Sequence, residues 1–341
     1  MDAADFDYRL PDDRIAQHPV EPRHASRLLD ARDMTDHTFI DLARLLEPGD
    51  LVVVNRTRVR AARLKGYKAG TGGAVEALVL RRLDGERWEV MLRPARRLRA
   101  GVQLVFGGVS ARLESDPIHG VAVMTLDTDD PERAITEAGE MPLPPYITAP
   151  LGDADRYQTM FADRPGSAAA PTAGLHFTDQ VVERLGGRGV QLASVELDVG
   201  LATFRPISTE TIEDHVMHTE RCRVDEAAAA AIARCRQRGG RVVAIGTTVV
   251  RTLESLAIGD GTVNPGEVDT DLYLTPGSQV SVTDLLVTNF HLPRSSLLVL
   301  VEAFMGPAWR HVYDEALQRG YRFLSFGDAM LCARNTYPDR P

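Results

Sequence analysis

The sequence predicts an α/β protein with a β-rich segment that has the pattern of a small antiparallel barrel or sandwich. Short β-like segments separated by turn signals fill residues 64–126, as in small barrels and sandwiches. After residue 149 the pattern changes to alternating strands and helices, which is typical of α/β domains. The opening section ends in a buried strand; if this strand shares a sheet with the later α/β part, the β-rich region is an insertion and the α/β domain is discontinuous.

The buried strand of the opening section is Leu51–Val54, which follows a Gly49-Asp50 turn. The predicted barrel strands are AVEALVL, RWEVMLR, VQLVF, VSARL and VAVMTL, and the Pro-rich string MPLPPYI marks the exit from the barrel. Later strands are QLASVELDV, RVVAIG and SVTDLLVTNF, and later helices are DEAAAAAIARCRQRGG, TTVVRTLESL, SSLLVLVEAFMG and PAWRHVYDEALQRG.

Composition indicates an ordinary folded protein of about two domains, since the chain has 341 residues, 44% of them apolar and 26% charged. The acidic start MDAADFDYRLPDDR lacks the basic flank and apolar stretch of a secretory signal, and no uninterrupted apolar run is long enough for a membrane span. Three distant cysteines, Cys222, Cys235 and Cys332, cannot all pair within the chain. We therefore expect a cytoplasmic protein without membrane contact.

The net charge of −9 argues against bulk attraction to nucleic acid, but the charge is unevenly distributed. Residues 51–115 carry 14 basic and 5 acidic residues, or +9, whereas the rest of the chain carries 25 and 43, or −18. A surplus sustained over this segment predicts a phosphate-binding face that includes Arg93, Arg96, Arg97 and Arg99. The alternative is that these arginines belong to a solvated turn.

Two histidine-containing strings are candidates for proton transfer. In AAAPTAGLHFT, small residues with Pro171 and Gly174 allow a ligand close to the backbone, while Thr172 and His176 supply a hydroxyl and an imidazole. A structural histidine is the alternative there. In EDHVMHTE, His215 and His218 would share one side of a helix, and Glu220 would be a third potential metal ligand. Because no fourth ligand follows at a typical spacing, we favour proton transfer and predict no metal.

Two further strings place polar groups at the ends of strands. AIGTTVVRTLES passes from a strand through Gly246 into a helix whose Thr247 and Thr248 offer backbone N–H groups and hydroxyls to a carboxylate or phosphate, with Arg251 as a second anion contact. A simple threonine cap is the alternative. In VTNFHLPRSSLL, Asn289 and His291 follow a strand and Pro293 is expected to open the next helix.

Taken in order, these strings resemble the S-adenosylmethionine:tRNA ribosyltransferase-isomerase family of queuosine biosynthesis. The resemblance spans nearly the whole chain and rests on FDYRLPDDRIAQHPVEPRHASRLL, GDLVVVNRTRVRAARL, MPLPPYI, YQTMFADRPGSAAAPTAGLHFT, TIEDHVMHTE, VVAIGTTVVRTLES, TDLYLTPG, VTNFHLPRSSLLVLVEAFMG and YRFLSFGDAM. It implies transfer and isomerisation of the ribosyl group of S-adenosylmethionine onto 7-aminomethyl-7-deazaguanine at the tRNA wobble position. Epoxyqueuosine-tRNA forms, and adenine and methionine leave.

The resemblance implies a discontinuous, barrel-like α/β domain of residues 1–63 and 149–341, with an inserted small antiparallel β-barrel of residues 64–148. It also implies S-adenosylmethionine and the tRNA anticodon stem-loop as partners, and no cofactor beyond this co-substrate. His176, His215 and His218 would be catalytic. The substrate-binding residues would be Arg58, Pro171, Thr172, Gly174, Asp198, Glu220, Gly246, Thr247, Thr248, Arg251, Asn289, His291 and Asp328. We expect a monomer.

Three positions depart from the family pattern. ELDVGLATFRPI places Asp198 at a histidine position and Ala202 at a glycine position, and Glu302 stands where the family has a small residue. These changes leave two alternatives open: a paralogue that uses S-adenosylmethionine on another amine, and a catalytically silent RNA-binding protein. A metal-dependent hydrolase built on His215, His218 and Glu220 is the least favoured alternative.

Overall fold

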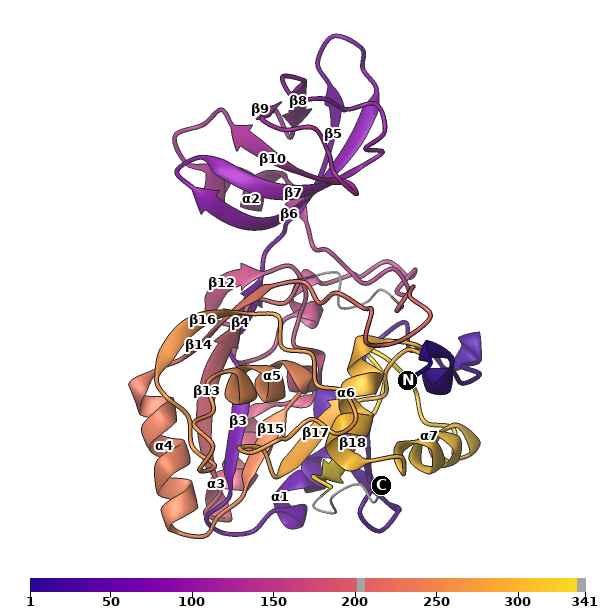
Figure 1. The fold of residues 1–341 in the computed structure, drawn as a ribbon, viewed down its shortest axis with the longest axis vertical. Helices are drawn as coiled ribbons and strands as arrows, with labels where there is room; N and C mark the ends of the chain where they lie inside the picture. The colour runs from indigo at the N-terminus through magenta and orange to yellow at the C-terminus, as the bar shows by residue number, and fades with distance from the viewer. Residues whose placement is uncertain (201–205, 336–341) are drawn as a thin grey trace. The chain divides into compact units, whose positions relative to one another are not determined.

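The computed structural model describes residues 1–200 and 206–335, which form two compact units (Figure 1). The first comprises residues 1–57, 144–164 and 170–341, and the second comprises residues 58–143 and 165–169. The predicted boundaries at residues 63/64 and 148/149 lie a few residues away, and the sequence did not indicate the short return segment 165–169. The fold class, a discontinuous α/β domain with an inserted antiparallel β-barrel, is confirmed.

The first unit is built on a nine-stranded mixed sheet. Its strand order is β16 (Gly266–Thr270), β14 (Glu220–Val224), β13 (Gln191–Leu197), β3 (Leu51–Asn55), β15 (Val242–Ile245), β17 (Leu285–Asn289), β18 (Ala329–Ala333), β1 (Arg27–Asp30) and β2 (Thr35–Thr38). The four central strands β13, β3, β15 and β17 run parallel, so their carboxyl ends meet at one edge. The opening section therefore shares a sheet with the later α/β part.

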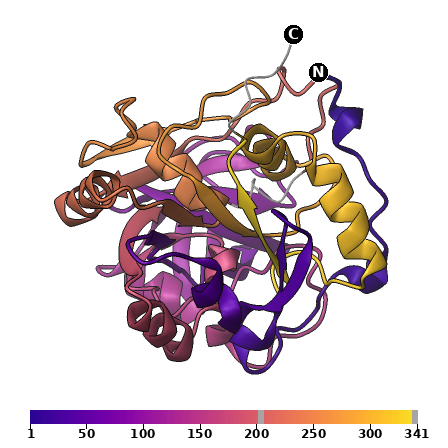
Figure 2. The ribbon, with the colours of Figure 1, turned by 90° about the horizontal axis from the view of Figure 1, so that it is seen from below.

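Helices cover both faces of this sheet (Figure 2). They are α1 (Leu42–Leu45), α3 (Asp179–Gly187), α4 (Glu226–Gln237), α5 (Thr247–Ser255), α6 (Ser296–Met305) and α7 (Trp309–Gln318). Strand β3 is apolar from Leu51 to Val54: Leu51 and Val53 pack with α4 to α7, and Val52 and Val54 pack with α1 and α3. A strand buried on both faces reads as a continuous apolar run, which is why the sequence revealed it.

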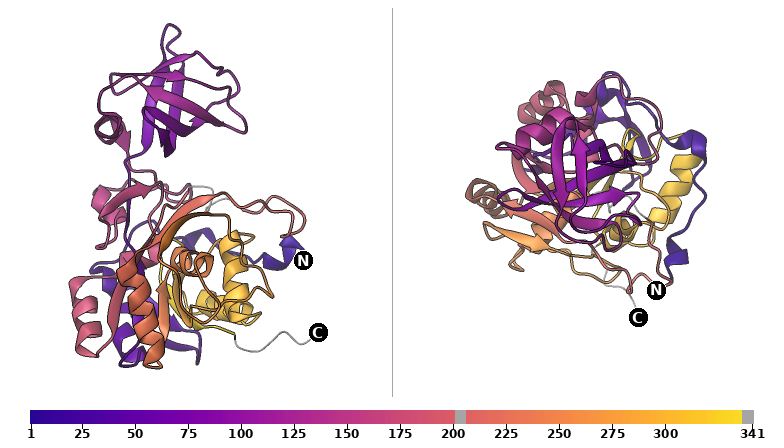
Figure 3. Two further views of the ribbon diagram at one scale, coloured as in Figure 1. Left: turned by 60° about the vertical axis from the view of Figure 1, so that its left-hand side comes forward. Right: turned by 90° about the horizontal axis from the view of Figure 1, so that it is seen from above.

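The second unit is a closed antiparallel barrel, drawn from two further directions in Figure 3. Its strands are β5 (Arg63–Lys68), β6 (Ala74–Asp84), β7 (Arg87–Arg93), β10 (Val121–Leu126), β9 (Val109–Leu113) and β8 (Gln103–Phe106), and β8 pairs again with β5. Closure requires Gly66, since a Cβ there would lie 2.1 Å from the carbonyl oxygen of Val105. Strand β11 (Gly139–Glu140) also pairs with β5, and α2 (Pro131–Ala138) precedes it. Short strands β4 (Thr57–Val59) and β12 (Arg164–Ser167) pair with each other.

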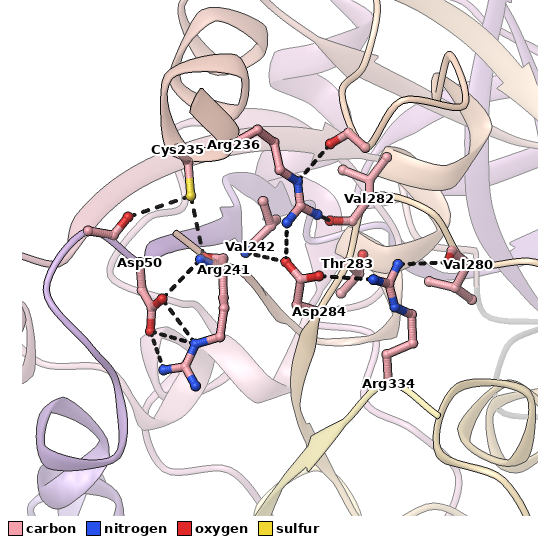
Figure 4. Close-up of polar contacts among 12 residues, drawn as sticks. Asp50, Cys235, Arg236, Arg241, Val242, Val280, Val282, Thr283, Asp284 and Arg334 are labelled. Carbon is pink, nitrogen blue, oxygen red and sulfur yellow. Dashed lines mark hydrogen bonds and ion pairs between the residues drawn. The ribbon is translucent and has the colours of Figure 1, made fainter. Parts of the chain in front are cut away.

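Two carboxylates, the buried Asp50 and the partly buried Asp284, bind arginines at the amino ends of the parallel strands (Figure 4). Asp50 precedes β3 and accepts bonds from the Nη2 of Arg241, at 2.6 Å, and from its backbone N–H, at 3.0 Å. Asp284 precedes β17 and accepts from Arg236, at 2.5 Å, and from Arg334, at 3.1 Å. The pairs with Arg241 and Arg334 join neighbouring strands at the sheet edge opposite their carboxyl ends, and the pair with Arg236 joins helix α4 to the same edge.

Two local predictions were wrong. The string EDHVMHTE is not a helix; residues 213–219 form a turn and an irregular segment before β14. Helix α6 does not open at Pro293: Ser295 is its N-cap, and the Ser295 hydroxyl accepts from the N–H of Leu298. The three cysteines are free thiols and buried. Within residues 1–200 and 206–335, no helix is both long and apolar enough to cross a bilayer.

Candidate active site

A pocket lies in the α/β unit where β13, β15 and β17 end. It contains about 610 Å³ of space between atoms, part of it open to solvent. Its walls come from the segments that follow these strands and from η6 (Thr172–His176). The lining residues are Tyr146, Ala170, Pro171, Thr172, Ala173, Val199, Gly246, Thr247, Thr248, Thr288, Asn289, Phe290, His291, Leu292, Ser295, Leu297, Leu324 and Ser325. Such a position is typical of ligand sites in α/β sheets.

Asn289 and Thr172 form one polar part of the wall. Asn289 is the last residue of β17 and is 2% exposed. Its Oδ1 accepts from the Thr172 hydroxyl at 3.0 Å, and its Nδ2 lies 3.2 Å from the carbonyl oxygen of Asp328. The structure thus brings together Thr172 and Asn289, which the sequence placed 117 positions apart.

His176 lies behind this wall and does not line the pocket. Its Nδ1 is 2.7 Å from the Ser26 hydroxyl and its Nε2 is 3.1 Å from Nδ2 of Asn289. The ring stacks on Phe39 with centroids 4.8 Å apart. Burial lowers the pKa of His176 to about 4, so the imidazole is neutral at pH 7. A smaller pocket, which Arg23, Arg156 and Ser325 also line, reaches His176 from another side.

Helix α5 begins at the pocket. Gly246 is its N-cap with φ of +93°, a conformation that favours glycine, and Thr247 and Thr248 form its first turn. The Thr248 hydroxyl is buried, and among the described residues it has no hydrogen-bond partner. The first backbone N–H groups of a helix favour an anion. This end of the pocket therefore offers hydrogen-bond donors.

Arg251 lies one turn further along α5 and does not line the pocket. Its Nη1 forms an ion pair with Glu220, and its Nε donates to the carbonyl of Leu272 at 3.1 Å. The two ion-paired side chains are 4% and 6% exposed, and Glu220 also accepts from the N–H of Gly200 at 2.7 Å. Glu220 thus neutralises the charge that the sequence suggested for a substrate anion.

His291 lines the pocket and is held through its backbone. Its N–H donates to the Tyr313 hydroxyl at 3.0 Å, and its carbonyl accepts from the Tyr8 hydroxyl. Its Nε2 lies 2.9 Å from the Thr288 hydroxyl. Burial lowers the pKa of His291 to about 3, which keeps this imidazole neutral.

His215 and His218 lie outside the lining. His215 is half-buried with its ring 5.5 Å from that of Tyr273, and His218 is exposed. Burial, with a smaller contribution from His218, lowers the pKa of His215. Among residues 1–200 and 206–335, no group of three or more His, Cys, Asp or Glu side chains is placed to hold a metal ion.

The remaining predicted substrate-binding residues are also away from the pocket lining. Gly174 packs in η6, where a Cβ would lie 3.0 Å from the Thr159 methyl group. Asp198 follows β13 and accepts from the Thr57 hydroxyl at 3.1 Å. Asp328 is buried and accepts from the backbone N–H groups of Arg27 and Arg322. Arg58 is exposed on β4, in the other unit.

Of the other departures from the family pattern, Ala202 falls outside the described residues. Glu302 binds the Nε1 of Trp309 at 2.5 Å and Arg310 at 3.2 Å. It thereby joins helices α6 and α7, and it takes no part in the pocket.

In the barrel unit the four predicted arginines Arg93, Arg96, Arg97 and Arg99 are all exposed. Arg93 ends β7, and the others follow in the connection to β8. Among the described residues Arg93, Arg96 and Arg97 form no ion pair, whereas Arg99 lies 3.9 Å from Asp116. The unit as a whole carries 14 basic and 12 acidic residues, or +2, so its positive charge is local.

Several lining residues were missed as site residues. Tyr146, whose hydroxyl lies 2.7 Å from that of Ser325, belongs to MPLPPYI, and Leu324 and Ser325 belong to YRFLSFGDAM. The sequence did contain a signal for them, because MPLPPYI and YRFLSFGDAM are both among the strings that carry the family resemblance. Their side chains reach the pocket only through folding of the whole domain.

The fold and pocket define a ligand-binding α/β protein with an inserted barrel. The family described as queuosine biosynthesis protein matches residues 3–332. S-adenosylmethionine:tRNA ribosyltransferase-isomerases of Moorella thermoacetica and Heliobacterium modesticaldum are 50% and 51% identical, each over 97% of this chain and 99% of the relative. The crystal structure of S-adenosylmethionine tRNA ribosyltransferase from Thermotoga maritima is 36% identical, with a TM-score of 0.54, over 96% of this chain and 99% of that chain. The chain belongs to the queuosine biosynthesis protein family.

Proposed function

We propose that the pocket at the ends of β13, β15 and β17 binds S-adenosylmethionine for the reaction after which the relatives are named. The chain is a transferase and isomerase of tRNA modification. It transfers and isomerises the ribosyl group onto the aminomethyl group of 7-aminomethyl-7-deazaguanine at the wobble position and releases adenine and methionine. The observation that carries the pocket assignment is its polarity: donors lie at the start of α5, and acceptor oxygens lie at Asn289 and Thr172.

The chemistry requires proton transfer in a site with little water. The positive sulfonium acidifies the adjacent 5′ carbon, a base forms the ylide, and loss of adenine and closure of the new ring require proton donation. His291 lines the pocket, but its pKa of about 3 makes its imidazole a weak proton acceptor, so we keep His215 and His218 as the proton carriers. No metal or further cofactor is needed, and the enzyme acts as a monomer in the cytoplasm.

Thr247 and Thr248 would hold the methionine carboxylate. The first turn of α5 offers backbone N–H groups, and the helix dipole favours negative charge at that end. The buried Thr248 hydroxyl, which has no hydrogen-bond partner among the described residues, would donate to the same carboxylate. Arg251 would contribute to carboxylate binding only indirectly: its ion pair with Glu220 holds α5 against strand β14.

Replacing Thr248 with valine should weaken S-adenosylmethionine binding about tenfold and should not lower the free energy of unfolding, because a buried hydroxyl without a hydrogen bond costs stability and valine removes that cost. Calorimetric titration and urea denaturation measure the two quantities. Thr252→Val is the matched control: its hydroxyl already bonds to the Thr248 carbonyl at 2.9 Å, so it should retain affinity. Equal affinity of Thr248→Val and the unmodified enzyme would contradict the carboxylate assignment.

The reaction is tested by incubating the protein with S-adenosylmethionine and an anticodon stem-loop carrying 7-aminomethyl-7-deazaguanine. We expect free adenine and a matching mass gain on the RNA by mass spectrometry. Adenine release without RNA would instead support another amine acceptor. If calorimetry detects no binding of S-adenosylmethionine, the pocket assignment is wrong and an RNA-binding role remains.

The exposed arginines of the barrel unit would bind the tRNA backbone. Arg93, Arg96 and Arg97 have no carboxylate partner among the described residues, so their charges are available to phosphates. Lys68 lies beside them, since its Nζ donates to the carbonyl of Arg97 at 2.9 Å. This local group supports binding better than the net charge of the unit does.

Changing Arg93, Arg96 and Arg97 together to alanine should reduce the salt dependence of tRNA affinity, with the logarithmic slope falling by about 0.7 to 0.9 for each phosphate that is no longer neutralised. Fluorescence anisotropy at several salt concentrations measures the slope. A control with the same charge change replaces Arg81, Arg87 and Arg133, which pair with Glu89, Asp84 and Glu137. If the salt-dependence slopes of the two variants are equal, Arg93, Arg96 and Arg97 do not bind phosphates and belong to a solvated turn.

A further inference from the structure

The orientation of the Asn289 amide is fixed by its neighbours. The carbonyl oxygen of Asp328 can only accept a hydrogen bond, so the atom 3.2 Å from it must be the amide nitrogen of Asn289. On its other side, the amide oxygen accepts from the Thr172 hydroxyl at 3.0 Å. The oxygen of Asn289 is therefore directed toward Thr172, which lines the pocket.

This orientation also determines the tautomer of His176. The Asn289 nitrogen has two hydrogens, one for Asp328 and one for Nε2 of His176, which lies 3.1 Å away. Nε2 must then accept, so the ring hydrogen is on Nδ1 and is donated to the Ser26 hydroxyl at 2.7 Å. Both ring nitrogens are thus occupied by the protein's own groups.

The surroundings keep His176 neutral. It is 5% exposed and stacked on Phe39. Burial is the main cause of its lowered pKa, Arg322 and Arg23 lower it further, and Asp328 partly opposes them. At pH 7 the ring therefore serves as a fixed acceptor at Nε2.

We propose that His176 is a positioning residue whose Nε2 holds the Asn289 amide so that the Thr172–Asn289 wall presents hydrogen-bond acceptors to the cationic part of the bound donor. This proposal rests on the proposed function, and it replaces the proton-transfer role that the sequence suggested for His176. Acceptor oxygens suit the positive charge of the sulfonium of S-adenosylmethionine, whereas the start of α5 suits its carboxylate. These two parts of the pocket wall would thereby orient the donor.

His176→Gln and His176→Leu distinguish positioning from proton transfer. A glutamine oxygen can replace Nε2 as the acceptor but cannot carry a proton, and leucine can do neither. We expect the Gln variant to retain turnover within about tenfold and the Leu variant to lose about a hundredfold, the range seen when groups that orient a site residue are removed. The dependence of kcat/KM on pH should have the same shape in the Gln variant and the unmodified enzyme.

Loss of turnover in the Gln variant equal to that in the Leu variant, or disappearance of one ionisation from its pH profile, would overturn the proposal. If the Leu variant does not fold, the turnover and pH profile of the Gln variant still decide. Nitrogen NMR of the imidazole gives a readout without turnover: we expect hydrogen on Nδ1 throughout pH 6–8, and hydrogen on Nε2 would refute the assignment. If the unmodified enzyme releases no adenine but His176 shows the Nδ1 tautomer, the proposed function is wrong while the hydrogen-bonding pattern of His176 stands.

Discussion

Replacing Arg251 with methionine is expected to lower the free energy of unfolding by about 3 to 5 kcal/mol, because the change leaves the Glu220 carboxylate buried without its cation. The two side chains are 4% and 6% exposed, so water cannot replace the missing partner. Methionine retains much of the side-chain volume, so the effect reports the charge more than a cavity. Urea denaturation monitored by circular dichroism measures the difference.

A second variant shows whether the unpaired charge causes this loss. Adding Glu220→Gln to Arg251→Met removes the charge, while the glutamine oxygen can still accept from the N–H of Gly200. We expect the double variant to recover most of the lost stability. If it is as unstable as the single variant, packing around α5 is responsible. A role for Arg251 as a direct anion contact predicts instead a large loss of S-adenosylmethionine affinity with little loss of stability.

This ion pair illustrates why the site was only partly predictable from the sequence. The strand-turn-helix pattern around Gly246 is a local feature of the sequence, and the structure places this helix start in the wall of a pocket. The partner of Arg251 lies 31 positions earlier on β14, and no local pattern connects the two. His176 is similar: its neighbours Ser26 and Asn289 come from sequence positions 150 and 113 residues away.

The fold was more accessible, because its elements have strong local signals. The alanine-rich helix Glu226–Gln237 begins after a capping Asp225, and the barrel strand Arg87–Arg93 alternates buried and exposed positions. The helix predicted around His215 and His218 was wrong, because its local signal is weak. Its histidine spacing fits a helix, but the N-terminus pairs there, through the Asp2–Thr211 bridge and the bond from Ile212 to Met1. Such tertiary contacts override weak local preference.

The order of the nine strands also lay beyond local pattern. Strand β3 comes from the opening section, yet it lies between β13 and β15, which follow the barrel in sequence. Buried apolar runs predict strands but do not identify their neighbours. The position of the pocket follows from this order, because it brings the segments after β13, β15 and β17 to one edge of the sheet.

Replacing Asp50 with asparagine should cost about 3 kcal/mol of stability at pH 7 by breaking a buried ion pair. The Asp50 side chain is 2% exposed and accepts from Arg241 and, at 2.8 Å, from the N–H of Glu47. Although burial opposes it, these hydrogen bonds hold the pKa of Asp50 below its usual value. A carboxyl with a lowered pKa in the folded state stabilises the protein above the unfolded pKa, near 4, and this contribution is lost as the pH falls through the folded pKa.

The difference in stability between the unmodified protein and Asp50→Asn should therefore be constant above about pH 5 and shrink progressively below about pH 4. Urea denaturation between pH 3 and 7 measures it. Glu47→Gln is the matched control, because Glu47 binds the same Arg241 at 3.1 Å but is 73% exposed, and exposed pairs contribute about 1 kcal/mol or less. A difference for Asp50→Asn that stays constant down to pH 3, or a control as unstable as Asp50→Asn, would show that the buried charge is not what joins β3 to β15 at this edge of the sheet.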